Sequence, residues 1–440
     1  MNLAKRTRLD PGGEWYSLPV SHVTLRQART FLAAARYSSI TKAAQAINRS
    51  QTSVTKALQD LERELDVELF DRSSKGVTLT AYGKALEKRA LQAGSALERA
   101  AGLVPPVIMK ASPGVARFFE MDVSDKWLDA FLATAEQQNL VSAAKRLNVT
   151  TAAVSANLRK LEDTLNTTLF ERMPNATIPT TFARTLVQFV KLARSHLRHA
   201  CDELSGMKGV RTGQVAVGSL PFMRTLILPR AITMMRQSHP YIDVSTLEGR
   251  YDDLIAALRC GDLDFLLGAL RGMANDSDLV EEPLLEDELS LIVRKGHPLQ
   301  EKSEIDWPDL LDYEWILPRH GTPTRDLFEA AIENHNLTPP LHVVETSSTL
   351  LLRGLLIETD HVTVLSRHQI YYDEKSGLLA ALPFDLPETQ RPIGITRRAH
   401  SSVAPAANLL IEDIKAVVKD IQGSEHQLQG ERTGIIHENA

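Results

Sequence analysis

The apolar positions of residues 25–65 recur at intervals of three and four, which is the spacing of amphipathic helices. They predict a first helix at the start of this stretch, a second from about Thr41, and a third over residues 51–64. Ser50 is the expected N-cap of the third helix, and Gly76 permits a tight turn between two short strands that follow it. The pattern therefore predicts three helices followed by a two-stranded wing.

The same pattern returns 100 residues later without a gap, so the chain contains a duplicated domain. Each copy spans about 60 residues, which is near the lower size limit for a self-standing hydrophobic core. We name residues 22–80 copy one and residues 123–180 copy two. The matching pairs are Phe31, Leu32 and Ala33 with Phe131, Leu132 and Ala133; Ala43 and Ala44 with Ala143 and Ala144; Asn48 with Asn148; Val54 with Val154; Leu61 and Glu62 with Leu161 and Glu162; Leu69, Phe70 and Arg72 with Leu169, Phe170 and Arg172; and Thr80 with Thr180.

A long helix with an apolar seam is predicted after each copy, over residues 82–101 and again from Phe182 to Leu204. The segment between the copies contains Pro105, Pro106, Pro113 and Gly114, so it cannot be one continuous helix. The expected division is therefore a helix with a Pro-rich linker over residues 81–122 and a linker helix over residues 181–208.

From Gln214 onward, short apolar runs alternate with helical patterns, which predicts parallel sheets with helical crossovers in two lobes. The chain is expected to cross between the lobes near residues 283–294 and to return near residues 383–395. These lobes make up residues 209–422, and a polar segment over residues 423–440 is predicted to be a flexible tail. Strands are predicted at residues 215–218, 242–247, 263–267, 315–317, 342–345 and 362–365.

Charge divides the chain into two halves. Residues 1–205 hold 28 Lys and Arg against 20 Asp and Glu, a net charge of +8, whereas the remaining residues hold 22 against 35, a net charge of −13. A basic front and an acidic back predict that only the front meets a polyanion. Random drift in charge is the alternative.

Composition excludes several classes of protein. There is no run of about 18 apolar residues for a membrane span, and the basic N-terminal residues are not followed by the apolar core of a secretory signal. Cys201 and Cys260 are the only cysteines, and the 13 histidines make no metal-ligand spacing. We therefore expect a protein of a reducing cytoplasm, and we expect no cofactor and no metal.

Candidate DNA-contacting residues gather at the start of the third helix of copy one. Hydrogen-bonding side chains at the N-terminus of a helix can reach base edges in the major groove. Positive charge on the wing suits contact with phosphate. A three-helix bundle used for protein contact is the alternative. The predicted DNA-contacting residues are Ser50, Gln51, Thr52, Ser53, Thr55, Lys56, Arg72 and Lys75.

Copy one resembles the DNA-binding domain of LysR-type transcriptional regulators. The resemblance rests on the runs Ser39-Ile-Thr-Lys-Ala-Ala-Gln-Ala-Ile-Asn-Arg-Ser-Gln-Thr-Ser-Val-Thr, Leu61-Glu, Leu69-Phe-Asp-Arg and Leu79-Thr. Residues 209–422 resemble the effector-binding domain of the same family, which is itself like a periplasmic binding protein. That resemblance rests on the runs Gly213-Gln-Val-Ala-Val-Gly, Leu258-Arg-Cys-Gly-Asp-Leu-Asp-Phe, Lys295-Gly-His-Pro-Leu and Val364-Leu-Ser-Arg-His.

The resemblance implies a multidomain protein with two all-α winged helix-turn-helix domains and a two-lobed α/β effector-binding domain like a periplasmic binding protein. It implies a ligand-responsive, sequence-specific DNA-binding transcription regulator that is not an enzyme. The implied partners are double-stranded operator DNA, a small-molecule effector, and a second copy of the chain in a homodimer or higher homo-oligomer. The family pairs two subunits through the linker helix, here Phe182 to Leu204, and packing of this helix within its own chain is the alternative.

The sequence departs from the family in two places. The family has one DNA-binding domain, and Thr52 stands where it usually has Pro or a small residue. Copy two also matches the pattern more weakly, because Thr151 replaces Gln51 and Met173-Pro-Asn-Ala-Thr stands where the wing should be basic. Copy two is predicted to be a subordinate DNA contact or a surface for protein contact. Its possible DNA contacts are Thr150, Thr151, Ser155 and Arg159.

Candidate effector-binding residues follow the predicted strands of the acidic half. Ligands in open α/β lobes bind at the carboxyl ends of the strands, and helix N-termini favour an anionic or polyhydroxyl molecule. The candidates are Ser219, Thr322, Thr324, Ser347 and Ser348, with plain N-capping as the alternative. No dinucleotide, phosphate-loop or nucleophile-elbow motif is present. A small-molecule enzyme or a thiol redox sensor fused to a DNA-binding domain stays as the alternative for this half.

Overall fold

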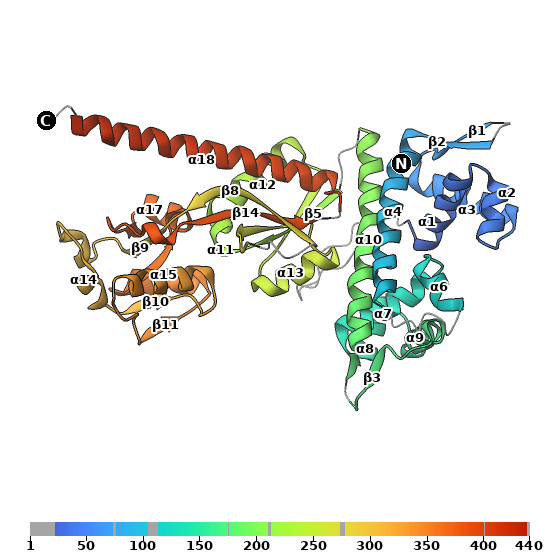
Figure 1. Ribbon diagram of the computed structural model, residues 1–440, viewed down its shortest axis with the longest axis horizontal. Coiled ribbons are helices and arrows are strands. Elements are labelled where there is room, and N and C mark those ends of the chain that lie inside the picture. The colour runs from blue at the N-terminus through green and yellow to red at the C-terminus, as the bar shows by residue number, and fades with distance from the viewer. Residues whose placement is uncertain are drawn as a thin grey trace. The chain divides into compact units, whose positions relative to one another are not determined.

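The computed structural model of the chain contains two compact units that divide between Gly213 and Gln214, except that the short segments Arg259–Asp262 and Ala404–Ala406 belong to the first unit. The two copies and the long helices form the first unit, and two sheet-containing lobes form the second (Figure 1). The structure describes residues 23–73, 76–103, 113–174, 176–209, 213–272, 278–399 and 401–437.

Copy one folds into the predicted three helices and wing. The apolar faces of its helices meet in one core, in which the side chains of Phe31, Val54 and Leu58 are almost completely buried. The rings of Phe31 and Phe70 lie 5.3 Å apart and join the first helix to the wing. The elements are α1 (Leu25–Tyr37), α2 (Ile40–Ala46), α3 (Gln51–Leu65) and the antiparallel strands β1 (Phe70–Ser73) and β2 (Gly76–Leu79).

Copy two repeats this arrangement, so the duplication in the sequence is also a structural one. Phe131 and Phe170 lie 5.9 Å apart, at the positions equivalent to the aromatic pair of copy one. The elements are α7 (Asp125–Gln137), α8 (Leu140–Leu147), α9 (Thr151–Leu165) and the antiparallel strands β3 (Phe170–Arg172) and β4 (Thr177–Pro179).

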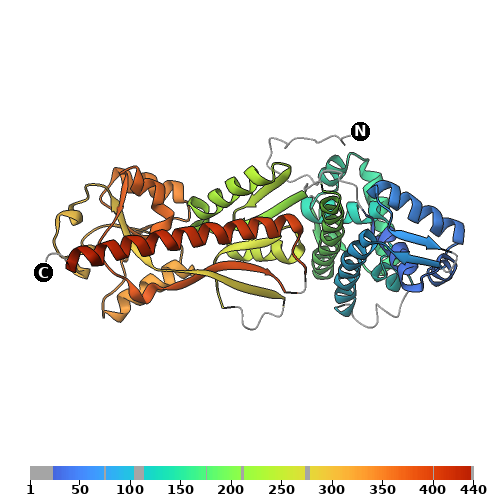
Figure 2. The ribbon, with the colours of Figure 1, turned by 90° about the horizontal axis from the view of Figure 1, so that it is seen from above.

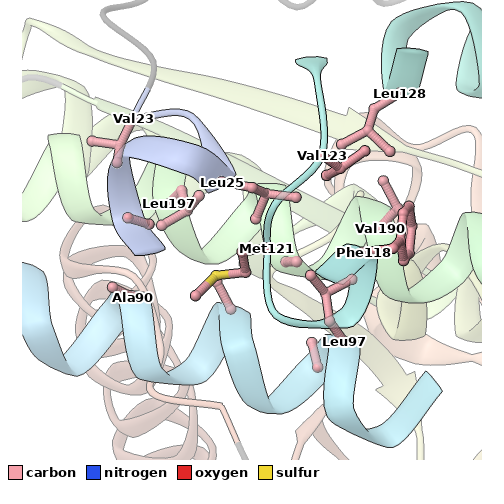
Figure 3. Close-up of a cluster of buried hydrophobic side chains, with 14 of the residues drawn as sticks. Val23, Leu25, Ala90, Leu97, Phe118, Met121, Val123, Leu128, Val190 and Leu197 are labelled. Atoms are coloured by element: carbon pink, nitrogen blue, oxygen red, sulfur yellow. The ribbon is translucent and has the colours of Figure 1, made fainter. Parts of the chain in front are cut away.

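The long helices that follow the copies, α4 (Ala81–Gly102) and α10 (Thr181–Met207), pack side by side (Figures 1 and 2). Ala90 and Leu97 of α4 and Val190 and Leu197 of α10 belong to one buried cluster (Figure 3). The family resemblance implied a partner helix from a second subunit for the seam of Phe182 to Leu204. In the structure the seam packs within its own chain, which is the alternative that the sequence left open.

The segment between the copies contributes to the same core, which the prediction of a simple linker missed. It contains a short helix, α6 (Pro113–Phe119), which contacts α4 and α9. Phe118, Met121 and Val123 are buried in the cluster that joins the two long helices (Figure 3). Apolar side chains within a proline-containing segment therefore pack between the copies.

The first lobe of the second unit has a five-stranded sheet with the order β6-β5-β7-β14-β8. Strands β5 and β7 are parallel, but β14 runs antiparallel to both of its neighbours. The prediction of a parallel sheet was therefore wrong in part, because β14 enters this lobe from the other one and so runs in the opposite direction. The elements are β5 (Gly213–Ser219), α11 (Pro221–Thr225), α12 (Ile227–Ser238), β6 (Ile242–Leu247), α13 (Tyr251–Cys260), β7 (Phe265–Ala269), β8 (Leu279–Asp287) and β14 (Arg391–Arg398).

The second lobe has a five-stranded sheet with the order β11-β10-β12-β9-β13. It is also mixed, because β9 runs antiparallel to β12 and β13 while β10 is parallel to β11 and β12. The elements are β9 (Leu289–Arg294), the 3-10 helix η1 (Pro298–Glu301), α14 (Trp307–Leu311), β10 (Trp315–Leu317), α15 (Pro323–Asn334), β11 (Val343–Glu345), α16 (Thr349–Glu358), β12 (Val362–Ser366), η2 (Arg367–Ile370), α17 (Tyr371–Lys375), β13 (Leu379–Ala381) and η3 (Pro387–Thr389).

A final helix, α18 (Pro405–His437), closes the second unit. Leu410 and Ile414 are buried along it, and the Lys415 ammonium lies 2.8 Å from the Glu282 carboxylate of β8. The helix is described as far as His437. The flexibility predicted for residues 423–440 from their composition stays a prediction.

Candidate nucleic-acid interface and effector lobes

The N-terminus of α3 is held by local hydrogen bonds. The Ser50 hydroxyl accepts a hydrogen bond from the Ser53 backbone N–H at 3.2 Å, and the Thr55 hydroxyl donates to the Gln51 carbonyl at 2.9 Å. The side chains of Gln51, Thr52 and Lys56 are exposed. Because Val54, Leu58, Leu61 and Leu65 on the opposite face are buried, the exposed side chains form one outward-facing group of donors and acceptors.

Glu62 connects α3 to the wing. Its carboxylate accepts hydrogen bonds from the backbone N–H groups of Leu69 at 2.9 Å and Phe70 at 3.3 Å, and from the Arg72 guanidinium at 3.1 Å. The predicted phosphate-contacting residue Arg72 is thus part of an ion pair that also sets its position on the wing. Lys75, the other predicted residue of the wing, lies outside the described residues.

In copy two, α9 has an equivalent N-cap and an equivalent hydrogen bond to the wing, but a different outer face. Thr150 caps the helix through the Ala153 N–H at 3.2 Å, and Glu162 accepts from the Leu169 N–H at 2.8 Å. The outer face has two alanines where copy one has Thr and Lys, and its positive charge lies further along the helix. Its exposed residues are Thr151, Ala152, Ala156, Arg159 and Lys160, and Ser155 is half-buried.

Three arginines of copy one converge on Asp122, a feature that sequence analysis did not identify. The carboxylate lies 3.1 Å from Arg26, 3.5 Å from Arg29 and 3.6 Å from Arg49, measured between charged atoms. Arg49 directly precedes the cap of α3, so the segment after α6 is joined to the side of copy one on which that helix begins. No periodic pattern marks these residues, because ion pairs between distant segments leave no spacing signal in a sequence.

The five candidate effector residues lie in both lobes of the second unit. Ser219 ends β5 in the first lobe, is buried, and accepts a hydrogen bond from the Arg224 guanidinium at 3.4 Å. In the second lobe, Thr322 precedes α15 and donates to the Arg319 carbonyl at 2.7 Å. Ser347 is exposed, and Ser348 caps α16 through the Leu351 N–H at 3.3 Å. Ser348 therefore does what the capping alternative predicted.

The fifth candidate, Thr324, is joined to a buried polar network where the chain passes between the lobes. Its hydroxyl accepts from the Arg391 guanidinium at 2.6 Å, and Arg391 is also 3.1 Å from the Asp287 carboxylate. Ser366 donates to the other oxygen of that carboxylate at 2.6 Å. Asp287 ends β8 and Arg391 begins β14, so this pair joins the two strands through which the chain leaves and re-enters the first lobe.

Burial dominates the electrostatics of this network. It raises the pKa of the Asp287 carboxyl above its usual value, although the Arg391 charge opposes that shift, and it lowers the pKa of Arg391. The mutual attraction of the two charges therefore opposes the free-energy cost of removing them from water. Neither residue was predicted from the sequence, because Asp287 and Arg391 lie 104 positions apart and only the fold brings them together.

Neither a membrane-spanning helix nor a metal-binding cluster is found in the described parts of the chain. No helix there is long and apolar enough to cross a membrane. Within the same residue ranges, no group of three or more His, Cys, Asp or Glu side chains could hold a metal ion.

Two family models match the chain. A model described as LysR substrate binding domain matches residues 208–419. A model described as bacterial regulatory helix-turn-helix protein, lysR family, matches twice, over residues 25–84 and 126–184. Both copies are therefore matched by the same DNA-binding family model.

Curated relatives are transcriptional regulators. The HTH-type transcriptional regulator GalR of Pseudomonas putida is 35% identical over 396 residues, which cover 90% of this chain and 98% of that protein. The regulator GbpR of Azospirillum brasilense is 27% identical over 68% of this chain and 88% of its own length. The GalR match leaves 44 of the 440 residues unaligned, fewer than one copy with its long helix, so this relative has residues aligned to both copies.

Solved structures share the fold. A full-length variant of OxyR from Pseudomonas aeruginosa has a TM-score of 0.51 at 23% identity and covers 68% of this chain and 95% of its own. CbnR, a LysR family transcriptional regulator, has a TM-score of 0.50 at 19% identity and covers 67% and 99%. The chain therefore belongs to the LysR family of transcriptional regulators, and it is a ligand-responsive DNA-binding regulator in which the winged helix-turn-helix is present twice.

Proposed function

We propose that copy one reads operator DNA through the N-terminal half of α3, with Gln51, Thr52 and Lys56 at base edges. The observation that supports this is the group of exposed donors and acceptors on a helix whose opposite face is buried and whose first turn is capped by Ser50. Amide, hydroxyl and ammonium groups in this position match the hydrogen-bonding pattern of the major groove. Ser53 and Thr55 shape the first turn, since both take part in local hydrogen bonds.

The wing of copy one is proposed to contact phosphate through Arg72 and Lys75. In the free protein Arg72 is paired with Glu62, so DNA would share this guanidinium with a carboxylate. Contact with phosphate positions the domain on the duplex without selecting a sequence. DNA binding would place the protein at the bacterial nucleoid.

The second unit is proposed to bind a small anionic or polyhydroxyl effector without transforming it chemically. Ser219 and Thr322 are the leading candidates, because each precedes a helix at the carboxyl end of a strand. The ion pair of Asp287 and Arg391 lies where the chain crosses between the lobes. An effector that changes how the two lobes are arranged would therefore change the surroundings of this pair. Effector binding would then change the affinity for DNA by about 1–3 kcal/mol.

Substitution of Gln51 tests the DNA assignment. Gln51→Ala is expected to cost about 1–3 kcal/mol at the cognate operator and to relax the base preference at one position. Gln59→Ala is the matched control, because Gln59 is exposed on the same helix two turns further from its N-terminus. Fluorescence anisotropy on operator variants measures both effects. Unchanged affinity and base preference in Gln51→Ala would refute the assignment.

A thermal-shift screen of carboxylates and sugars on the full chain tests the effector site. A compound that binds should raise the unfolding temperature of the second unit, and Thr322→Val or Ser219→Ala should reduce that rise. If neither substitution matters, the site lies elsewhere in the lobes. Chromatography of the compound after incubation tests the other half of the proposal, since its consumption would show that the protein is an enzyme.

A further inference from the structure

Copy one and copy two are held in one unit by the pairing of α4 with α10. The Arg89 guanidinium, only 2% exposed, lies 2.8 Å from the Glu203 carboxylate, and Arg99 stacks over the ring of Phe189. As the residue number rises along α4, the number of its partner falls along α10, so the two helices are antiparallel. Each helix therefore starts at its own copy and ends near the other one.

The ends of this helix pair also contact the third helices of the two copies. Just beyond α10, the Lys208 ammonium donates to the Leu65 carbonyl at 2.7 Å and lies 3.1 Å from Asp66, at the end of α3. After the end of α4, helix α6 packs against α9. Both α3 and α9 are thus positioned by the same pair of long helices, which leaves little freedom for the two copies to move independently.

The apolar face of α10 is already covered by its own chain. Leu186, Val190, Ala193, Leu197 and Leu204 are buried, and the cluster that contains them also contains Leu86, Ala90, Ala93 and Leu97 of α4. A second chain could use this face only by displacing α4. Self-association of the protein therefore has to use other surfaces.

We propose that one chain forms a complete pair of DNA-reading domains and recognises an asymmetric operator with two dissimilar half-sites. This inference rests on the proposed function of copy one and extends it to copy two. Copy one reads its half-site by hydrogen bonds, and copy two reads a thymine-rich half-site by methyl contacts. A homodimer of this chain then holds four DNA-reading domains, in two identical pairs that each combine copy one with copy two.

The exposed side chains of α9 specify the second half-site. Ala152 and Ala156 present methyl groups where copy one has Thr52 and Lys56, and apolar contact with the thymine methyl is the readout open to alanine. Thr151 adds a hydroxyl at the first position of the helix. Arg159 and Lys160 are exposed further along and supply positive charge for the DNA backbone.

Selection of binding sites from random duplexes tests this inference on the full-length protein. A random segment of about 25 bp can hold two half-sites one helical turn apart. The wild type should select two dissimilar half-sites, one of them rich in thymine. Gln51→Ala should relax one half only, and Ala156→Asp should weaken binding to the other half only, by about tenfold. Gln59→Ala is again the control.

Transfer of the proposed base-reading side chains of α3 onto α9 gives a second test. A purely structural role for copy two predicts no change in the selected sequence. The triple substitution Thr151→Gln, Ala152→Thr and Ala156→Lys gives α9 the three side chains with which α3 is proposed to read bases. This variant should select an inverted repeat of the half-site that copy one reads. All three positions are exposed, so its thermal unfolding should match that of the wild type.

The outcomes separate the inference from the proposed function. If the wild type selects an inverted repeat and Gln51→Ala relaxes both halves, copy one of two chains reads the operator and the inference is wrong. If copy-two substitutions change nothing, copy two does not read DNA and the inference is again wrong. In both cases the DNA-reading role of copy one stands. If Gln51→Ala changes no half-site, the proposed function itself fails.

Spacing between the half-sites provides an independent measurement. Insertion of about five base pairs rotates the second half-site by half a turn, and about ten displaces it by a full turn. Because α4 and α10 fix the separation of the copies, both insertions should reduce affinity to that of a single half-site. Full affinity after the ten-base-pair insertion would show that the two copies bind independently, which would overturn the inference.

Discussion

Copy one and copy two have the same internal framework and different outer surfaces. The backbone is left-handed at Ser38, Asn48 and Asp66 in copy one, and at the positions 100 residues later in copy two. In both copies a glutamate of the third helix accepts a hydrogen bond from the backbone N–H of the residue before the first wing strand, at Leu69 and at Leu169. These shared features all serve the fold of a single copy.

The differences lie where DNA would be contacted. Gln51 and Lys56 of copy one become Thr151 and Ala156 in copy two, with no change in the helix that carries them. The buried face of both helices has Val and Leu at the same positions. The comparison teaches that the fold of this domain depends on its buried positions and local caps, so its exposed face is free to acquire a second specificity.

The largest expected effect tests whether the two cores are equivalent. Phe31→Ala and Phe131→Ala each remove a completely buried ring, and each should destabilise its own copy by about 3–5 kcal/mol. Hydrogen exchange of the amides in α1 and α7 measures the two copies separately. Tyr37→Ala, at an exposed aromatic residue, is the control. A stable copy two after Phe131→Ala would contradict the equivalence.

The ion pair between the long helices should have the next largest effect. Arg89→Met leaves the partly buried Glu203 carboxylate without this partner, which should cost about 1–3 kcal/mol of unfolding free energy. Arg99→Met should cost less than about 1 kcal/mol, because this exposed residue stacks on Phe189 from the solvent side. Denaturant unfolding of the full chain measures both. Equal costs would mean that the ion pair does not hold the copies together.

The caps of the two long helices should differ slightly between the copies. Thr80→Ala and Thr180→Ala each remove a side-chain cap, at a cost of about 1 kcal/mol. The Thr80 hydroxyl also donates to the Glu68 carbonyl at 2.7 Å, whereas the equivalent bond from Thr180 to Thr168 measures 3.5 Å. Thr80→Ala should therefore be the more destabilising of the two in thermal unfolding. Thr80→Ser, which keeps the hydroxyl, is the control.

The smallest expected effect concerns the charge of copy two. Arg159→Ala should weaken binding to all operators alike, by about threefold. It should also reduce by about one the slope of the logarithm of the binding constant against the logarithm of the salt concentration. Gln59→Ala, at the equivalent position of copy one, should leave the salt dependence unchanged. Titrations at several salt concentrations measure this slope. An unchanged slope in Arg159→Ala would place this residue away from the DNA backbone.

Much of the first unit could be predicted from the sequence, since the apolar positions of its helices are strongly periodic. The N-cap Ser50 and the helix from Gln51 agree with the structure. The second unit was predicted less completely. Six of its strands were predicted near their observed positions, but β8, β9, β13 and β14 were not predicted as strands. The mixed direction of both sheets was therefore missed, because β9 and β14 are the strands that run antiparallel to their neighbours. The direction of a strand depends on the lobe from which the chain enters the sheet.

The candidate sites show the same limit. The exposed residues of α3 were predicted because they all lie on one helix. Within a helix, the position of a residue in the sequence determines the face on which its side chain lies. The network of Asp287, Ser366 and Arg391 was not predicted, because its members come from three strands that only the fold brings together. Likewise, the convergence of three arginines on Asp122 depends on the path of the segment between the copies.

By itself, the sequence determined the duplication, the helices of each copy, the face of each that is apolar, and the residues left on the outside. It determined these because they depend on spacing within one segment. Only the tertiary structure decided what covers the seam of α10. An apolar seam shows that a helix needs a partner, but its spacing is the same whether that partner is a second chain or, as here, α4 of its own.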